Sequence, residues 1–219
     1  FYPPPNPNNC AIARKISSGW DTDWKNIDAA FYYPPRHKAY LFKGTQYRGY
    51  LWASDKIQKA VPIQSWASCW PKSFTTVDAA AHYRKKNATY FFKGTKWFRY
   101  NWTGSKCSSV QGKLWGGGLK GWSHIDAAMH ANGSGDRYTY FFKGDQYIRY
   151  NWDNSKLSGP TSLKKWGLNS ASNPNVFTDG IQAIIEYKGH AQYFFKDDKY
   201  MKFKWTLDRT LCAVDDPAG

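Results

Sequence analysis

Short apolar runs recur along the chain, and each is closed by a polar turn. The runs "AYLF", "TYFF", "TYFF" and "QYFF" are followed by Lys-Gly or Lys-Asp and then by an aromatic segment of alternating pattern, such as "KWFRYNW". Alternating aromatic residues favour strands, and Gly or Asp after such a run favours a tight turn. The pattern predicts a series of short hairpins. Only one short amphipathic stretch, 55–64, has helical spacing.

The same unit occurs four times. A Phe at the end of the apolar run is followed ten residues later by Trp, as in Phe42–Trp52, Phe92–Trp102, Phe142–Trp152 and Phe195–Trp205. A second shared segment precedes each pair: "NIDAAF", "TVDAAA", "HIDAAM" and the weaker "GIQAII". The copies begin 50, 48 and 56 residues apart. Because both segments recur in the same order, the chain contains an internal repeat of roughly 50 residues.

This repeat predicts an all-β propeller with four blades. A unit of about 50 residues with several short strands is typical of a propeller blade. The small residues of the Asp-Ala-Ala segment suit the innermost strand, since the blades converge on the central axis and side chains have least room there. The four units therefore predict the smallest type of propeller.

The repeated residues are similar to a known family. The pattern I-D-A-A…Y-F-F-K-G…Q-Y-x-R-Y resembles the hemopexin repeat, over roughly residues 10–212. The resemblance implies a single hemopexin-type propeller domain across 1–219, with repeats at approximately 20–69, 70–119, 120–173 and 174–212.

The four cysteines favour disulfides over zinc, because they are even in number and none forms a C-x-x-C pair. The family resemblance implies that a Cys10–Cys212 disulfide closes the ring, where blade-to-blade packing is weakest. Cys69 and Cys107 lie outside that pattern, and we infer a second bridge between them. Four cysteines allow three pairings, so the alternatives stay open.

The resemblance also implies a structural calcium or sodium ion in the central channel, held by backbone carbonyls of the residue that opens each inner strand. Those residues are Asp28, Asp78, Asp126 and Gln182. Oxygen ligands suit such hard cations. A ring of carboxylates is an alternative, although Gln182 interrupts it. We expect most of these side chains to accept hydrogen bonds from nearby backbone amides instead.

The net charge of the chain indicates which classes of partner it attracts. The formal net charge is +15, and aromatic residues make up 19% of the chain. A strong positive field attracts acidic glycans, nucleic acid and anionic membranes. No run of 18 apolar residues is present, so we expect no membrane insertion. The chain begins with Phe1, which we interpret as the start of a processed, secreted protein.

Candidate binding residues are basic and aromatic. A ring of turn lysines (Lys43, Lys93, Lys143, Lys196) and strand cations (Arg48, Arg99, Arg149, Lys202) repeats with the blades. Each of these is also explained as a solvated turn residue or as a cation lying along an aromatic face. Binding specificity is more often placed in loops that differ between copies. Such positions include the Arg84-Lys85-Lys86 loop and Trp97, which replaces the Tyr of the other copies.

The tryptophans fall into two groups. Those that recur at one repeat position predict packing within the propeller: Trp52, Trp102, Trp152 and Trp205. Seven more lie in the connecting segments, some of which we expect between blades: Trp20, Trp24, Trp66, Trp70, Trp115, Trp122 and Trp166. Possible glycosylation sequons start at Asn87, Asn101 and Asn132.

Catalysis is disfavoured. Glu186 is the only glutamate, the histidines have no metal-binding spacing, and no nucleophile or phosphate-binding motif is present. We expect no haem, because the haem-binding relative uses residues between two propellers. Polyamines are cations and suit a basic chain poorly.

The sequence therefore predicts a secreted, non-enzymatic lectin. Acidic or sulfated glycans, including glycosaminoglycans, are the expected ligands, through shallow sites that act multivalently. The alternative is a module for protein–protein contact or matrix adhesion, which binds matrix or cell-surface glycoproteins without glycan specificity. Nucleic acid is expected to bind only non-specifically, because no recognised motif supports it.

Overall fold

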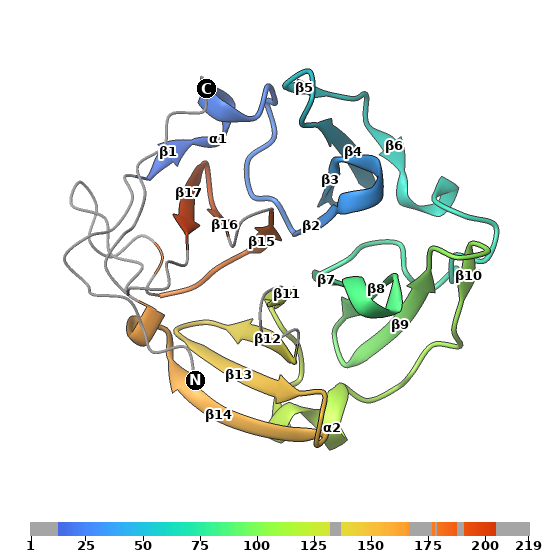
Figure 1. Cartoon of the computed structure of the whole chain (residues 1–219), viewed down its shortest axis with the longest axis vertical. Coiled ribbons are helices and arrows are strands. Elements are labelled where there is room, and N and C mark those ends of the chain that lie inside the picture. Colours follow the sequence, from blue (N-terminus) through green and yellow to red (C-terminus); the bar gives the residue numbers. More distant parts are fainter. Residues whose placement is uncertain (1–12, 132–136, 167–176, 178, 188–190, 205–219) are drawn as a thin grey trace.

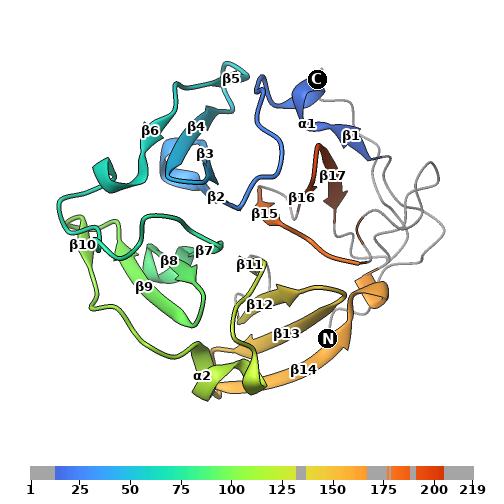
Figure 2. The ribbon, with the colours of Figure 1, turned by 180° about the vertical axis from the view of Figure 1, so that it is seen from behind.

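Four antiparallel sheets are arranged as blades around a central axis (Figure 1). The computed structural model describes residues 13–131, 137–166, 177, 179–187 and 191–204. Figure 2 shows the same ring from the opposite side. The prediction of an all-β, four-bladed propeller is confirmed.

Each blade is an up-and-down sheet whose first strand lies next to the axis. Blade 1 contains β2 (Ala29–Tyr33), β3 (Lys38–Lys43), β4 (Gln46–Leu51) and β5 (Lys56–Ile57), and β6 (Val61–Pro62) also pairs with β4. Blade 2 contains β7 (Ala79–Tyr83), β8 (Ala88–Lys93), β9 (Lys96–Asn101) and β10 (Lys106–Cys107). Blade 3 contains β11 (Ala127–His130), β12 (Tyr138–Lys143), β13 (Gln146–Asn151) and β14 (Lys156–Ser162).

Blade 4 is completed by the other end of the chain. It contains β15 (Ala183–Glu186), β16 (Ala191–Lys196), β17 (Lys199–Lys204) and, as its outermost strand, β1 (Arg14–Lys15). Arg14 pairs with Tyr200 and Lys15 with Lys199. The first described residues thus join the first and last repeats by backbone hydrogen bonds, which the sequence analysis did not predict.

The disulfide predictions have different outcomes. Cys69 and Cys107 form a disulfide, so the inferred second bridge is confirmed. It ties the linker between blades 1 and 2 to the outermost strand of blade 2. Cys10 and Cys212 lie outside the described residues, so a ring-closing bridge between them stays a prediction.

In the part of the chain that the structure describes, helical structure is confined to short turns. They are α1 (Ile16–Gly19), η1 (Pro34–Arg36), η2 (Ile63–Ser65), η3 (Arg84–Lys86), α2 (Trp115–Gly118), η4 (Leu119–Gly121) and η5 (Leu163–Trp166). A helix over 55–64 was therefore wrong: Val61 pairs with Tyr47 of β4, and Pro62 ends any helical continuation. Within the described ranges, no helix has the length and apolarity needed to cross a membrane.

The four inner strands surround the axis and lie against one another in the order β2, β7, β11, β15. Each begins with alanine: Ala29, Ala79, Ala127 and Ala183 are at most 1% exposed. A larger side chain at this position would meet the neighbouring strands. This crowding is the physical reason that every copy of the repeat has alanine at this position.

The hydrophobic core is divided among the four seams between blades. One cluster joins blades 1 and 2, and the others join blades 2 and 3, 3 and 4, and 4 and 1. All seven linker tryptophans are buried in these clusters or packed against them: Trp20, Trp24, Trp66, Trp70, Trp115, Trp122 and Trp166. Packing at the seams therefore accounts for all seven, more than the expected few.

Candidate functional site

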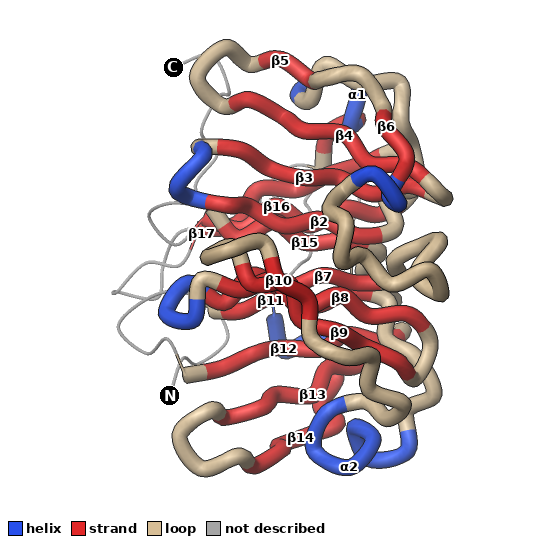
Figure 3. Tube along the Cα trace, turned by 90° about the vertical axis from the view of Figure 1, so that its right-hand side faces the viewer, coloured by secondary structure: helices blue, strands red, loops and turns tan. Residues whose placement is uncertain are grey.

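The alternation of strand direction gives the ring two different faces. The loops after inner strands β2 and β7 share one face with the turns after β4, β9 and β13, and we call it the basic face. Backbone bonds join loop and turn in three blades: Trp52 N–H to His37 O (3.4 Å), Trp102 N–H to Asn87 O (3.0 Å) and Trp152 N–H to Arg137 O (2.7 Å). Figure 3 shows the short helices η1 and η3 together on the left side of the ring. The opposite face, where the inner strands begin, is the entry face.

Cations predominate on the basic face. Arg36, Lys85 and Lys86 are exposed in the loops, and the turns and their flanks add Lys56, Lys106, Arg137 and Lys156. Described carboxylates of this face include Asp55, Asp153 and Glu186, and Asp21 lies 3.9 Å from Lys56. Asp153 pairs with Arg137 at 3.1 Å, and Asp55 accepts a hydrogen bond from Tyr50. Most of the described aspartates lie on the entry face: Asp28, Asp78, Asp126, Asp145, Asp179, Asp197 and Asp198. The basic face is therefore the surface that attracts anions.

Turn lysines on the entry face are held by the chain itself. Lys43 Nζ donates to the carbonyl of Lys25, Lys93 Nζ donates to Thr75 Oγ1 (2.9 Å), and Lys196 pairs with Asp179. In each case the lysine fastens the segment that leads into the inner strand of the same blade. Three of the four repeated turn lysines thus have a structural role.

Aromatic stacks cross the seams at the basic face. The Trp102 indole stacks on Tyr33 of the preceding blade at 3.7 Å between ring centroids, and Arg36 lies over Trp102 at 5.3 Å. One seam further, Trp152 packs on Tyr83 at 4.7 Å, and Lys86 lies 4.5 Å from the Trp152 ring. Two seams therefore carry the same Tyr–Trp–cation arrangement, and in each the cation comes from a loop of the basic face.

Buried hydrogen bonds connect these stacks to the inner strands. Trp102 Nε1 donates to Thr89 Oγ1 (2.9 Å), and Thr89 Oγ1 is 3.0 Å from His82 Nδ1. In blade 3, Trp152 Nε1 donates to Thr139 Oγ1 (2.9 Å), which is 3.0 Å from His130 Nδ1. Both networks use the hydroxyl to satisfy an indole and an imidazole, as buried polar groups require.

Blade 1 lacks the corresponding hydroxyl. Ala39 occupies the position of Thr89, and the buried Trp52 Nε1 has no hydrogen-bond partner among the described residues. Trp52 nevertheless stacks on Tyr187 of blade 4 at 4.0 Å. The stack of Trp52 on Tyr187 therefore forms without a hydrogen-bond network like those of blades 2 and 3.

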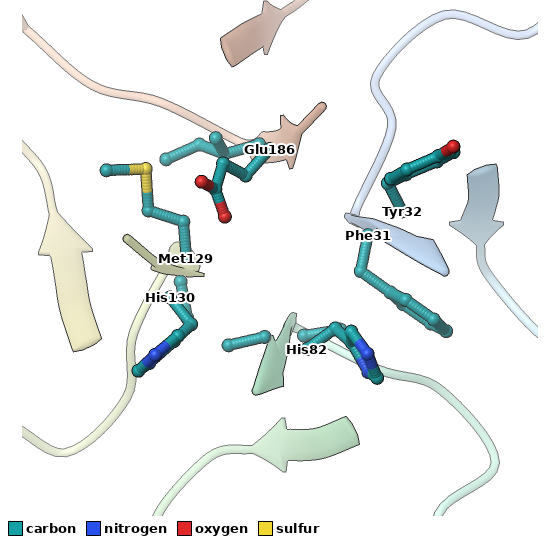
Figure 4. Close-up of a pocket in the computed structure, with 10 residues that line it drawn as sticks. Phe31, Tyr32, His82, Met129, His130 and Glu186 are labelled. Carbon is teal, nitrogen blue, oxygen red and sulfur yellow. The ribbon is translucent and has the colours of Figure 1, made fainter. Parts of the chain in front are cut away.

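A small cavity opens where the channel reaches the basic face. It has room for about one water molecule (about 10 Å³). Its lining comes from all four inner strands and includes Tyr32, His82, His130 and Glu186, which occupy one repeat position. Figure 4 shows the Glu186 carboxylate turned towards the middle of the ring and both imidazoles turned away from it.

Burial controls ionisation around this mouth. Burial lowers the pKa of His82 to about 3, and the charges of Arg84 and His130 add to the shift. Burial also raises the pKa of Tyr32 to about 12, Tyr187 adds to that shift, and Arg84 opposes it. His82 and Tyr32 are therefore neutral near pH 7. Arg84, whose charge acts on both rings, follows His82 by two residues, directly after the end of β7.

Arg84 differs from the other cations of the basic face. It is the first residue of η3, directly after the inner strand β7, and it is half-buried. Its Nε and Nη2 atoms are shielded from solvent and have no hydrogen-bond partner within the described part of the chain. The adjacent Lys85 and Lys86 are exposed.

The aspartates predicted around the channel are used inside the blades. Asp28, Asp78 and Asp126 accept hydrogen bonds from the turn amides of Gly44, Gly94 and Gly144 at 2.6–2.7 Å. Gln182 does the same in blade 4, accepting from Asp197 N–H at 2.6 Å. The expectation that these side chains satisfy backbone amides is confirmed. No group of three His, Cys, Asp or Glu side chains arranged for a metal occurs in the described ranges.

The strand cations do not form one ring, because Arg48 is out of register. Arg99, Arg149 and Lys202 pair across the sheet with Tyr90, Tyr140 and Tyr193, whereas Arg48 pairs with Leu41. A shift of one residue turns a side chain to the other side of a sheet.

Contacts confirm this difference between Arg48 and the other strand cations. Arg48 bonds to Asp23 (2.8 Å) and lies over Trp24 at 4.5 Å. Arg149 lies over Tyr138 at 4.4 Å. The prediction that strand cations lie along aromatic faces is confirmed for these two.

Other candidates are separated by the fold. Trp97 is the second residue of β9, near the entry face, where its ring stacks on Trp115 at 5.0 Å and its Nε1 donates to Lys113 O (2.9 Å). It does not meet the Arg84-Lys85-Lys86 loop. Among the sequons, Asn87 lies on the basic face and donates to Thr103 Oγ1 (3.1 Å), and Asn101 ends β9. Asn132 lies outside the described residues.

The sequence analysis missed the position that lines the channel mouth. Tyr32, His82, His130 and Glu186 each follow the repeated Asp-Ala-Ala segment at the same distance. A recurrent polar or amphipathic residue within an otherwise apolar inner strand was the available signal.

A sequence model of the hemopexin family matches residues 125–170, most of the third repeat. The chain is a hemopexin-fold protein. The structure of the hemopexin fold protein CP4 from cow pea is similar, with 21% sequence identity and a TM-score of 0.67, covering 84% of this chain and 88% of that one. A search of curated protein sequences gave no significant match.

Two further similar structures come from Cicer arietinum. One is a plant albumin showing hemagglutination, with 20% identity, a TM-score of 0.67 and coverage of 83% of this chain and 87% of that chain. The other is a plant lectin with two metal binding sites, with 20% identity, a TM-score of 0.65 and coverage of 88% and 91%. At this identity, the similarity establishes the hemopexin fold.

Proposed function

We propose that this hemopexin-fold protein is a secreted, non-enzymatic lectin that prefers acidic or sulfated glycans. The observation that carries the proposal is the asymmetry of charge between the faces. On the basic face the exposed cations outnumber the described carboxylates, whereas on the entry face seven described aspartates offset the lysines and three turn lysines bind their own chain. Sulfate and carboxylate groups accept charge-assisted hydrogen bonds from Arg and Lys, and those bonds are the strong ones.

Two other observations support the proposal. Similar structures include an albumin showing hemagglutination and a lectin, which makes glycan binding a reasonable use of this fold. The Cys69–Cys107 disulfide is typical of an oxidising compartment and supports secretion.

The repeated seams suit a multivalent ligand. Arg36 beside Trp102 and Lys86 beside Trp152 present one cation per seam on the same face. Each contact is weak by itself, but an extended polyanion that reaches both gains avidity from the second contact.

The test compares two double variants that lose the same number of cations from different parts of the surface. Arg36→Gln with Lys86→Gln removes two cations from the basic face, and Lys72→Gln with Lys96→Gln removes two exposed lysines elsewhere. We expect the first pair to weaken binding to a sulfated oligosaccharide by about tenfold, as for two contacts of ~1 kcal/mol or less each, and the second pair to change it little.

Equal weakening by both pairs would overturn the assignment to the basic face. A glycan array with neutral, carboxylated and sulfated members tests the function itself. An array without hits, together with capture of a defined matrix glycoprotein that survives removal of its glycans, would favour the protein-binding alternative.

We also propose a structural cation held by backbone carbonyls at the entry end of the channel. The four inner strands begin there, and the side chains of Asp28, Asp78 and Asp126 are already engaged by turn amides. Backbone oxygens are the ligands that suit calcium or sodium. Calcium should raise the thermal midpoint of chelator-treated protein, and an unchanged midpoint with both ions would contradict the proposal.

A further inference from the structure

The channel mouth contains an unused pair of hydrogen-bond donors. In arginine, the Nε–H and one Nη2–H point the same way and form a fork that matches two oxygens of one carboxylate or sulfate. In Arg84 these two atoms are the ones without a partner among the described residues. Leaving charged donors unpaired and shielded from solvent costs free energy, so the arrangement favours an acceptor that reaches them.

Its surroundings suit an oxyanion at the rim and disfavour one inside the channel. Neutral His82 and Tyr32 lie near the guanidinium, and exposed Lys85 and Lys86 follow it in η3. The Glu186 carboxylate faces the middle of the ring, which repels a second negative charge from the interior (Figure 4). Arg84 is half-buried and not fully enclosed, so binding of a ligand requires its guanidinium to turn outward.

We propose that Arg84 is the residue that recognises the acidic group of the glycan, by binding one carboxylate or sulfate through its Nε–Nη2 edge at the mouth of the channel. This inference rests on the proposed lectin function and narrows it. The exposed cations of the basic face attract the polyanion, and Arg84 makes the directional contact. An uncharged saccharide has no group for the fork.

The chain offers closely matched variants. Arg84→Gln removes the charge and the fork, and Arg84→Lys keeps the charge but loses the fork. Lys85→Gln removes the same charge from the adjacent exposed position. Binding is measured by calorimetry to a sulfated oligosaccharide, to an unsulfated uronate oligosaccharide and to a neutral one, which separates sulfate from carboxylate as the group recognised.

We expect both Arg84 variants to weaken binding by about tenfold or more and Lys85→Gln by about twofold, because bonds from a charged donor are worth more than diffuse attraction. Binding by Arg84→Lys equal to that of the wild type would overturn the inference, as would equal weakening by Arg84→Gln and Lys85→Gln. Either result would leave the lectin function intact, provided that the wild-type chain binds the acidic oligosaccharides.

A second readout does not depend on glycans. Thermal midpoints are compared in sodium sulfate and in sodium chloride of matched ionic strength, and the comparison between variants removes the general stabilisation that sulfate gives any folded protein. We expect an extra stabilisation by sulfate in the wild type and in Lys85→Gln that is lost in Arg84→Gln. The same extra stabilisation in all three proteins would overturn the Arg84 site. If no glycan binds the wild type, the lectin proposal fails while this measurement still decides the site.

Discussion

The indole of Trp102 stacks on the phenol of Tyr33 at 3.7 Å, with the ring planes 10° apart, across the seam between two blades. The same indole donates from Nε1 to Thr89. Trp102 thus packs against blade 1 through the face of its ring and forms a hydrogen bond within blade 2 through the edge of its ring. Trp52 has an equivalent stack on Tyr187 but no partner for Nε1 among the described residues.

This difference predicts unequal costs for the same substitution. Trp102→Phe loses stacking area and the indole–Thr89 bond, whereas Trp52→Phe loses only area. We expect the free energy of unfolding to fall by ~1 kcal/mol more for Trp102→Phe than for Trp52→Phe, the net worth of one hydrogen bond. Urea unfolding measures both. Equal losses would mean that the Thr89 bond contributes nothing to stability.

Thr89→Val should be costly although the two side chains have the same shape. The substitution leaves the Trp102 indole and the His82 imidazole without their shared partner in a buried site. We expect a loss of about 1–3 kcal/mol in the free energy of unfolding. Thr45→Val, at an exposed turn, is the control and should have little effect. A loss at Thr89 no larger than at Thr45 would refute the network's contribution.

A hydroxyl introduced into blade 1 should supply the hydrogen-bond acceptor that Trp52 Nε1 lacks among the described residues. Ala39→Thr places a hydroxyl where Thr89 and Thr139 stand, within reach of Trp52 Nε1. We expect Ala39→Thr to be more stable than Ala39→Val, which has the same bulk, by ~1 kcal/mol. The comparison cancels any cost of overpacking, since Ala39 is fully buried. Equal stabilities would show that the hydroxyl does not reach the indole.

His82 should make the fold sensitive to acid. Burial lowers its pKa to about 3 from 6.5, so between these values the unfolded chain binds a proton that the folded chain does not. Stability therefore rises with pH in this window and is lost as pH falls from 6.5 towards 3. The expected slope from this residue is ~1.4 kcal/mol per pH unit. Unfolding from pH 4 to 7 should be less pH-dependent in His82→Gln, and unchanged slopes would contradict the assignment.

The Cys69–Cys107 disulfide should stabilise the linker between blades 1 and 2. It closes a sequence separation of 38 residues. The chain-entropy model gives about 3–4 kcal/mol for a loop of that size. We expect Cys69→Ser with Cys107→Ser to lower the unfolding free energy by this order. Titration of thiols in the native wild type is the control, and free thiols at both positions would refute the pairing.

Much of the fold was predictable because it repeats. The distance from Phe to Trp is ten residues in every copy, and that regularity identified the blades without any contact information. Local rules also sufficed for the hairpin turns, since Lys-Gly after an apolar run has a direct conformational meaning. The Cys69–Cys107 disulfide could be inferred because the family resemblance already pairs Cys10 with Cys212, which leaves these two cysteines.

Less of the candidate site could be predicted from the sequence. The Arg84-Lys85-Lys86 loop was identified, but the sequence did not distinguish half-buried Arg84 from its exposed neighbours. Arg48 was grouped with Arg99, although one residue of difference in register places it on the other side of its sheet. Trp97 and this loop were both candidate positions because they differ between copies, and the structure places Trp97 near the opposite face.

By itself, the sequence determined the four repeats, the strand order within each blade and the basic charge, because these depend on spacing and composition along the chain. Only the tertiary structure decided that β1 completes blade 4, that the linker tryptophans pack into the seams, and that exposed cations outnumber the described carboxylates on one face. Those outcomes depend on contacts between residues far apart in the chain. The unpaired donors of Arg84 belong to this second group, because their shielding from solvent is a property of the folded chain.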